Sequence, residues 1–179
     1  MKKTDPNTIT ILTLDPSGAY NEGKGTTGYS IWLFNTISKG YGILLTGNIR
    51  AEHFSNQYDY FSSHLDLIKR AEPDVIVMED FTLYANKAKQ QIGSTMETPQ
   101  LIGLIKFYCA EYNIELVMQR AVDVKNRWSD KILEYKGLVY RDPRGSFRDM
   151  NHYKVSRHAK DAIRHGIHYI TKRIKELNI

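Results

Sequence analysis

Cysteine is almost absent from the chain, because Cys109 is the only one among 179 residues. A single thiol excludes a disulfide within a monomer and any metal site built from several cysteines. Cys109 stands in an apolar stretch, so we expect it to be buried and unreactive, in a reducing compartment.

Long apolar runs are also missing, and no segment approaches the roughly 20 residues that a membrane-spanning helix needs. The sequence begins MKKTDPNTIT, which carries two lysines but no apolar stretch of the kind found in secretory signals. We therefore expect a cytoplasmic protein with no membrane partner. Repeats and linker-like segments are absent as well, so residues 1–179 are predicted to form a single domain.

Basic residues are few in the first two thirds of the chain and concentrated in the last third. Residues 1–119 contain 10 Lys and Arg against 13 Asp and Glu, whereas residues 120–179 contain 15 against 7, a net charge of +8. A positive surface of this kind favours binding to a polyanion such as nucleic acid. The alternative is a set of basic helices that are merely solvated.

The sequence does contain a regular alternation of β-rich and helical segments. Apolar β-forming residues predict strands over 8–14, 27–34, 41–49, 74–78 and 114–118. Apolar residues at helical spacing predict helices over 56–70, 98–109, 122–135 and 153–177, the second with Thr98 as its N-cap. Residues 137–151 are predicted to be a basic loop. The order βββαβαβα is typical of an α/β fold with a mixed five-stranded sheet flanked by helices.

Three carboxylates fall where these segments meet one edge of the predicted sheet. Asp15 ends the first strand and Glu79 ends the fourth. Asp161 lies in the last helix, three residues after His158 and on the same face. Converging carboxylates repel one another unless they bind divalent cations. The set therefore predicts a metal-dependent nuclease, because two such ions activate water and stabilise the leaving oxygen of a phosphodiester.

Each of these residues also has an ordinary explanation. Asp15 precedes a proline turn, Glu79 has a second acid beside it, and a helical histidine such as His158 is often structural. His165 lies on the same helical face as Asp161, so it is either a partner of that carboxylate or, more simply, a surface imidazole.

The residues around these carboxylates resemble the motifs of RuvC-type Holliday junction resolvases, which belong to the ribonuclease H-like nucleases. Residues 15–16 (DP) followed by 27–29 (TGY) are similar to the opening motif of that family, and 77–79 (VME) to its central motif. Residues 124–125 (VK) are similar to its basic pair after the fifth strand. Residues 158–162 (HAKDA) are similar to the closing motif, in the variant that begins with His. The resemblance spans nearly the whole chain and implies a ribonuclease H-like fold.

The resemblance implies an endodeoxyribonuclease that resolves Holliday junctions or other branched DNA by paired symmetric nicks, in DNA recombination and repair. It implies two Mg²⁺ ions per active site, with Mn²⁺ as a substitute, held by the four catalytic residues Asp15, Glu79, His158 and Asp161. It also implies a homodimer, because a four-way junction is two-fold symmetric. The apolar stripe of the second helix is either the dimer interface or a face that packs in the core, and it consists of Leu101, Leu104, Ile105 and Tyr108. Residue usage rich in Asn, Lys, Ile and Tyr is typical of an AT-rich genome, such as that of a bacteriophage.

Basic and aromatic residues near the predicted site are the candidates for DNA contacts, namely Lys87, Lys89, Lys125, Arg127, Lys131, Arg144, Arg148, Phe81 and Tyr84. The cations would contact phosphates. The two aromatic residues would stack on bases at an open junction centre or pack in the core.

Two features depart from the family pattern. The insertion Ala19–Gly25 lengthens the connection after Asp15 and is either a flexible loop over the DNA or an element that changes the substrate. Phe81 and Tyr84 do not reproduce the spacing of the family's aromatic residue. Two alternatives therefore stay open: a ribonuclease H-like enzyme that cuts an RNA–DNA hybrid, a flap or linear DNA, and a non-catalytic nucleic-acid-binding module.

Overall fold

The computed structural model describes residues 5–21, 23–81 and 96–178 of the chain. The strands are β1 (Thr8–Asp15), β2 (Thr26–Asn35), β3 (Tyr41–Arg50), β4 (Val75–Glu79), β5 (Glu115–Gln119), β6 (Tyr140–Arg141) and β7 (Phe147–Arg148). The helices are η1 (Ala51–His53), α1 (Gln57–Ala71), α3 (Glu97–Glu111), α4 (Ala121–Arg127), α5 (Asp130–Tyr135) and α6 (Arg157–Glu176). None of these described helices is both long and apolar enough to cross a membrane.

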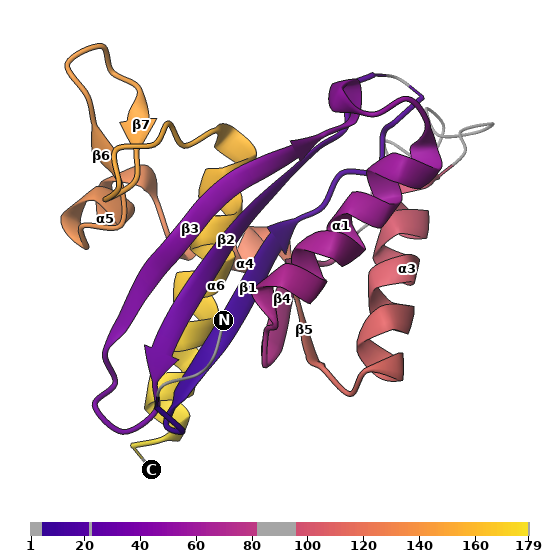
Figure 1. The fold of residues 1–179 in the computed structure, drawn as a ribbon. Coiled ribbons are helices and arrows are strands. Elements are labelled where there is room, and N and C mark those ends of the chain that lie inside the picture. Colours follow the sequence, from indigo (N-terminus) through magenta and orange to yellow (C-terminus); the bar gives the residue numbers. More distant parts are fainter. Residues whose placement is uncertain (1–4, 22, 82–95, 179) are drawn as a thin grey trace.

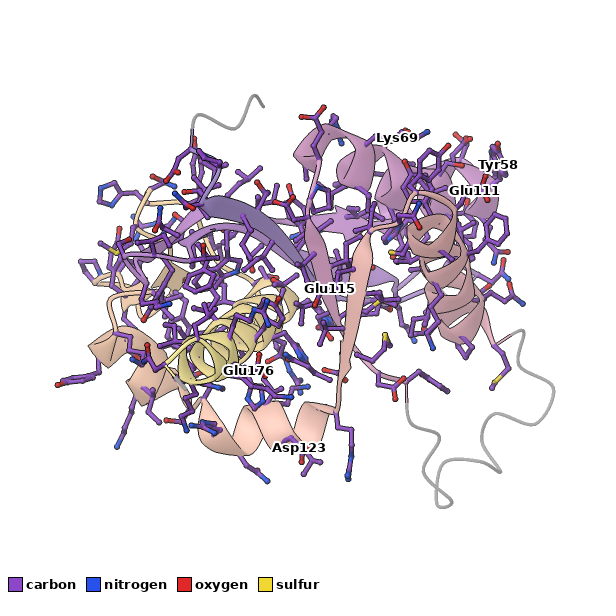
Figure 2. The ribbon with its side chains drawn as sticks, turned by 90° about the horizontal axis from the view of Figure 1, so that it is seen from below. Tyr58, Lys69, Glu111, Glu115, Asp123 and Glu176 are labelled. Carbon is purple, nitrogen blue, oxygen red and sulfur yellow. The ribbon has the colours of Figure 1, made fainter. Side chains whose placement is uncertain are left out.

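The predicted mixed sheet is confirmed, with five strands in the order β3-β2-β1-β4-β5. The strands β1, β2 and β3 pair antiparallel, whereas β4 pairs parallel with β1 and with β5. Parallel neighbours need a crossover, and α1 and α3 supply one before β4 and one before β5. These two helices cover one face of the sheet, while α6 and α4 lie on the other (Figures 1 and 2).

Successive side chains of the central strands point to opposite faces of the sheet, so the hydrophobic core consists of one cluster on each face. Ile11 of β1 and Val77 of β4 pack in the cluster that contains α6 residues, whereas Leu12 and Met78 pack with α1 and α3. Cys109 belongs to the second cluster and is buried as predicted, and burial raises the pKa of its thiol to about 11.

The same alternation aims the two strand-terminal acids at one helix. Thr13 is on the α6 face of β1, where its hydroxyl donates to the carbonyl of Ala162 at 2.8 Å. Because side chains in a strand repeat with a period of two, Asp15 lies on that face as well. Glu79 follows Val77 by two residues and so lies on the α6 face of β4. The sheet therefore presents both carboxylates to the helix that carries Asp161.

Two predicted helix boundaries were wrong because side chains take other partners. The α3 helix begins at Glu97, with Met96 rather than Thr98 at its N-cap position. The Thr98 hydroxyl instead accepts a hydrogen bond from the backbone N–H of Gly18 at 2.9 Å. The α6 helix begins at Arg157, about four residues later than predicted, because Ser156 is its N-cap.

The segment between β5 and α6 is also more divided than predicted. The single helix expected over 122–135 is interrupted at Trp128, which is buried and separates α4 from α5. The basic loop expected over 137–151 contains the hairpin β6–β7, joined by a turn in which Asp142 accepts hydrogen bonds from the N–H groups of Arg144 and Ser146.

The described part of the insertion Ala19–Gly25 packs against the body of the protein instead of extending as a free loop. The Tyr20 hydroxyl donates to the carbonyl of Phe54 at 3.1 Å, and the Gly25 N–H donates to the carbonyl of Ala19 at 2.9 Å. The N–H of Asn21 lies 3.3 Å from the buried carboxylate of Glu97. The insertion thus ties the turn after Asp15 to the start of α3.

A buried histidine of α1 fixes the same turn. His64 is fully buried, with Nδ1 2.9 Å from the carbonyl of Tyr60 and Nε2 2.8 Å from the hydroxyl of Thr27. The Thr27 hydroxyl in turn accepts from the backbone N–H of Ser17 at 3.0 Å. This arrangement suits a neutral imidazole that donates from Nδ1 and accepts at Nε2. Burial lowers the pKa of His64 to about 4.

We expect this histidine to make folding sensitive to acid. The unfolded chain binds a proton at His64 near pH 6.5, whereas the folded protein excludes it until about pH 4. The contribution of His64 to the free energy of unfolding is therefore fully present above pH 6.5. It is lost as the pH decreases toward 4, and it amounts to ~3 kcal/mol in total. Urea unfolding through this range measures the slope, which His64→Gln should flatten and the exposed-site control His53→Gln should not. Equal slopes in all three proteins would contradict this assignment.

Candidate active site

Asp15 and His158 form a hydrogen-bonded pair at the carboxyl end of β1. Nδ1 of His158 lies 2.7 Å from Oδ2 of Asp15, whose side chain is buried. Burial raises the pKa of Asp15, the hydrogen bond from His158 opposes this, and the negative charges of Glu79 and Asp161 raise it further. The same hydrogen bond raises the pKa of His158. Glu79 and Asp161 thus lie close enough to Asp15 for their charges to raise its pKa.

Glu79, at the end of β4, is approached by two nitrogen atoms. Both Nζ of Lys125 and Nε2 of His165 lie 3.3 Å from its Oε2. Burial opposes ionisation of this carboxyl, but His165 and Lys125 outweigh it and lower the pKa of Glu79. His165 is completely buried, and its Nδ1 lies 2.8 Å from Oε1 of Gln119. The surface position expected for His165 was wrong, because it orients Glu79 from within the core.

Asp161 completes the site from α6, one turn after His158, and it is only 4% exposed. Its Oδ2 lies 3.4 Å from Nζ of Lys125, and its Oδ1 is ion-paired with Arg164. Lys125 thus bridges Glu79 and Asp161. Burial opposes the charge on this lysine, but the surrounding carboxylates raise its pKa above the ordinary value. The ammonium is therefore a fixed positive charge among three acids.

Arg164 connects Asp161 to the turn between α4 and α5. Its guanidinium also pairs with Asp130, and its Nε donates to the carbonyl of Trp128 at 2.8 Å. Lys160 binds the second carboxylate oxygen of Asp130 at 2.8 Å. Sequence reasoning missed this group. The spacing of three between Asp161 and Arg164 is a signal that could have identified the arginine. No local pattern indicates Asp130, because packing of separate helices brings it there.

The close approach of α6 to β2 places the helical residues beside the strand ends. Gly28 is the register partner of Asp15 and is buried under the first turn of α6. A Cβ atom at Gly28 would lie only 2.0 Å from the backbone carbonyl carbon of His158. Only a residue without a side chain allows this contact, which gives the TGY sequence a packing role.

The donor set of the site suits a hard divalent cation. Carboxylate oxygens are the ligands that Mg²⁺ and Mn²⁺ prefer, and the site already surrounds the Lys125 ammonium with acids. Within the described ranges, no three acidic or imidazole groups are gathered closely enough to coordinate one ion as they stand. The Asp161 oxygens are instead directed to Arg164 and Lys125.

The predicted DNA contacts lie on several different elements. Lys125 lies in it, Arg127 and Lys131 are exposed on α4 and α5, and Arg144 is exposed in the turn of the β6–β7 hairpin. Arg148 is ion-paired with Asp142 at 2.9 Å and stabilises that hairpin. Phe81 packs against the α1–α3 side of the core. The remaining candidates, Tyr84, Lys87 and Lys89, lie outside the described residues.

The predicted dimer stripe on α3 is mostly part of the core. Leu101 and Ile105 are completely buried within the protomer, so they cannot form an interface. Other residues of the helix are more accessible. Phe107 is 70% exposed, and Tyr112, just after the helix, is 60% exposed and stacks on Tyr108 at a centroid distance of 4.4 Å.

Comparison with known proteins identifies solved structures with a similar fold. No protein-family model and no curated protein matches the chain. Among solved structures, it is similar to T. thermophilus RuvC in complex with Holliday junction substrate, with 13% identity, a TM-score of 0.61, and coverage of 93% of this chain and 96% of that one. It is also similar to the fowlpox virus Holliday junction resolvase, with 15% identity, a TM-score of 0.54, and coverage of 92% and 99%. The chain therefore has the ribonuclease H-like fold of the RuvC-type Holliday junction resolvases.

Proposed function

We propose that the protein is a metal-dependent endodeoxyribonuclease that resolves Holliday junctions and related branched DNA by paired symmetric nicks. The observation that carries this proposal is the convergence of Asp15, Glu79 and Asp161, with His158, at one edge of the sheet. A role in recombination or in processing branched replication intermediates follows from the substrate, and the proposed location is the cytoplasm of a bacterial or infected host cell.

Asp15, Glu79 and Asp161 are the residues that would hold two Mg²⁺ ions, or Mn²⁺ in their place, next to His158. Such ions activate water for attack on a phosphodiester and stabilise the leaving 3′ oxygen. Neighbouring residues of the chain hold these carboxylates in position. His165 and Gln119 fix the orientation of Glu79, and Arg164 fixes that of Asp161.

His158 has a different part in the reaction. Its Nδ1 is held by Asp15, while the side chain is 44% exposed, so Nε2 on the far side of the ring is accessible to water or a phosphate. The hydrogen bond to Asp15 raises the pKa of His158, which favours the protonated form of the imidazole. A charged imidazole there would orient the scissile phosphate and donate a proton to a departing oxygen.

The basic residues around the site would bind the DNA backbone. Lys125, Arg127, Lys131 and Arg144 are the described candidates, with Lys87 and Lys89 beyond the described ranges. Because such contacts release counterions, affinity should fall steeply with salt. A homodimer would present two sites to a two-fold symmetric junction, and the exposed Phe107 and Tyr112 give α3 an apolar surface for it.

The direct test is cleavage of a labelled four-way junction in Mg²⁺, beside a linear duplex and an RNA–DNA hybrid of matched sequence. We expect paired symmetric nicks confined to the junction. Cleavage of the hybrid, a flap or the linear duplex instead would assign the metal site to another substrate. Junction binding without cleavage in Mg²⁺ or Mn²⁺ would leave a non-catalytic binding module.

Lys125 should compete with divalent metal for the carboxylates. Its side chain is 40% exposed, so solvent screens the attraction, and we assign ~1 kcal/mol to its interaction with Glu79 and Asp161. Lys125→Met should therefore tighten Mn²⁺ binding to the DNA-free protein by about fivefold. Isothermal titration calorimetry measures this, with Lys131→Met on α5 as the control. Weaker Mn²⁺ binding in Lys125→Met would show that the ammonium does not occupy the cation position.

A further inference from the structure

The five-residue loop before α6 carries two large side chains, Met150 and Tyr153, that are mostly exposed. Residues 150–154 are all exposed, although Asp149 and Val155 on either side of them are only 1% and 5% exposed. Within the loop, Met150 is 62% exposed and Tyr153 is 63% exposed. In Figure 1 the β6–β7 hairpin stands away from the sheet, and this loop leads from β7 back to the start of α6.

Hydrogen bonds fix the backbone of this loop. One carboxylate oxygen of Asp149 accepts from the N–H groups of Asn151 and Tyr153, both at 3.0 Å, and the other accepts from the hydroxyl of Thr46 on β3 at 2.7 Å. The Asp149 N–H donates to the carbonyl of Tyr153 at 3.0 Å. Because the tyrosine side chain takes no part in these bonds, the loop presents it on a preorganised backbone. A ligand that binds Tyr153 would therefore meet little additional ordering cost.

The loop is close to the catalytic residues. Ser156, which follows it, donates a hydrogen bond to Asn48 of β3 and caps α6. Tyr153 precedes His158 by five residues, so their Cα atoms are at most ~18 Å apart along an extended chain. A phosphate bound at the candidate active site and a base stacked on Tyr153 would thus be only a few nucleotides apart in the DNA.

The charges around the loop suit a nucleic acid. Residues 136–157 contain six Lys and Arg against two Asp. Both acids have internal partners, since Asp142 binds Arg148 and Asp149 is buried. Lys154 and Arg157 are exposed on either side of the α6 cap. An exposed aromatic ring in a basic segment suits the binding of unpaired bases, which stack on the ring while the cations contact the phosphates.

We propose that Tyr153 is a base-stacking residue, which receives an unpaired nucleobase at the branch point of the DNA substrate. The proposal rests on the proposed function and adds a contact that holds the branch point in a defined position relative to His158. Met150 supplies further apolar surface on the same loop.

The test uses an Asp161→Asn background, so that the junction is bound but not cut. Tyr153→Ala should weaken binding to a four-way junction by about tenfold and binding to linear duplex by less than about twofold, since linear DNA offers no unpaired base. Tyr153→Phe should restore junction affinity. Tyr135→Ala, which removes a 92% exposed tyrosine from the end of α5, is the matched control and should have no effect.

Photocrosslinking supplies a readout that a purely structural role would not change. With 5-iododeoxyuridine at the branch point, irradiation and peptide mapping should identify Tyr153. Unchanged affinity in Tyr153→Ala with crosslinks elsewhere would overturn the inference while leaving the nuclease assignment intact. A change in sedimentation from dimer to monomer would overturn it too, by making the loop a protein contact. Absence of junction binding in the parent Asp161→Asn protein would refute the proposed function and this inference with it.

Discussion

Asp161→Asn should lower the rate of junction cleavage by at least ~10³-fold, because a bound metal stabilises the transition state by several kcal/mol and this carboxylate is a predicted ligand. Asparagine keeps the shape of the side chain and can still accept a hydrogen bond from Arg164, which retains Asp130 as its counter-charge. The fold should therefore persist. Junction affinity should stay the same or increase, since one negative charge near the phosphate is lost. Single-turnover cleavage, binding and thermal unfolding measure the three effects.

A matched control separates loss of a ligand from loss of charge. Asp123→Asn changes an acid on the adjacent helix α4, whose side chain is 58% exposed and whose nearest ion-pair partner, Arg120, is 4.0 Å away. Its cleavage rate should equal that of the unchanged protein. Asp15→Asn and Glu79→Gln should behave like Asp161→Asn. Normal cleavage by Asp161→Asn would show that the site has been assigned to the wrong residues.

The sheet could be predicted from the sequence because its signals are local. Apolar β-rich runs and helical spacing identified all five strands and the order of the main helices, and the strand-terminal positions of Asp15 and Glu79 were readable directly. The errors arose where a side chain binds a distant partner. Thr98 looks like a helix cap in isolation, but its hydroxyl is taken by Gly18, 80 residues earlier in the chain.

The candidate site likewise contains residues that could be predicted from the sequence and residues that could not. The acids and His158 could be predicted because each ends an element or lies on a defined helical face. The groups that orient them could not, since they depend on packing between elements. His165 illustrates this, because its helical position is compatible with a surface imidazole, and only the approach of α6 to β4 and β5 brings it to Glu79 and Gln119. The surroundings shift the pKa values of two of these acids in opposite directions, because burial raises that of Asp15, whereas His165 and Lys125 outweigh burial and lower that of Glu79.

Gly28→Ala is the substitution that tests this packing at the candidate active site. The new Cβ would lie 2.0 Å from the His158 carbonyl carbon and 2.3 Å from the Ala159 nitrogen, both of which are backbone atoms that cannot rotate away. The first turn of α6 must therefore move outward by about 1 Å or more, and a displacement of that size can cost about 10²-fold in rate. Overpacking should also destabilise the fold by roughly 1–3 kcal/mol.

The glycine of a neighbouring strand is the control for this substitution. Gly42 of β3 has open space at its Cβ position, so Gly42→Ala should leave both cleavage and stability unchanged. Single-turnover cleavage below the melting temperature of each variant distinguishes a misplaced helix from an unfolded protein. A folded Gly28→Ala protein with full activity would mean that α6 tolerates displacement, and the positions of His158 and Asp161 would then not control catalysis. Loss of activity with retained folding and junction binding would instead establish that the contact between β2 and α6 sets the geometry of the site.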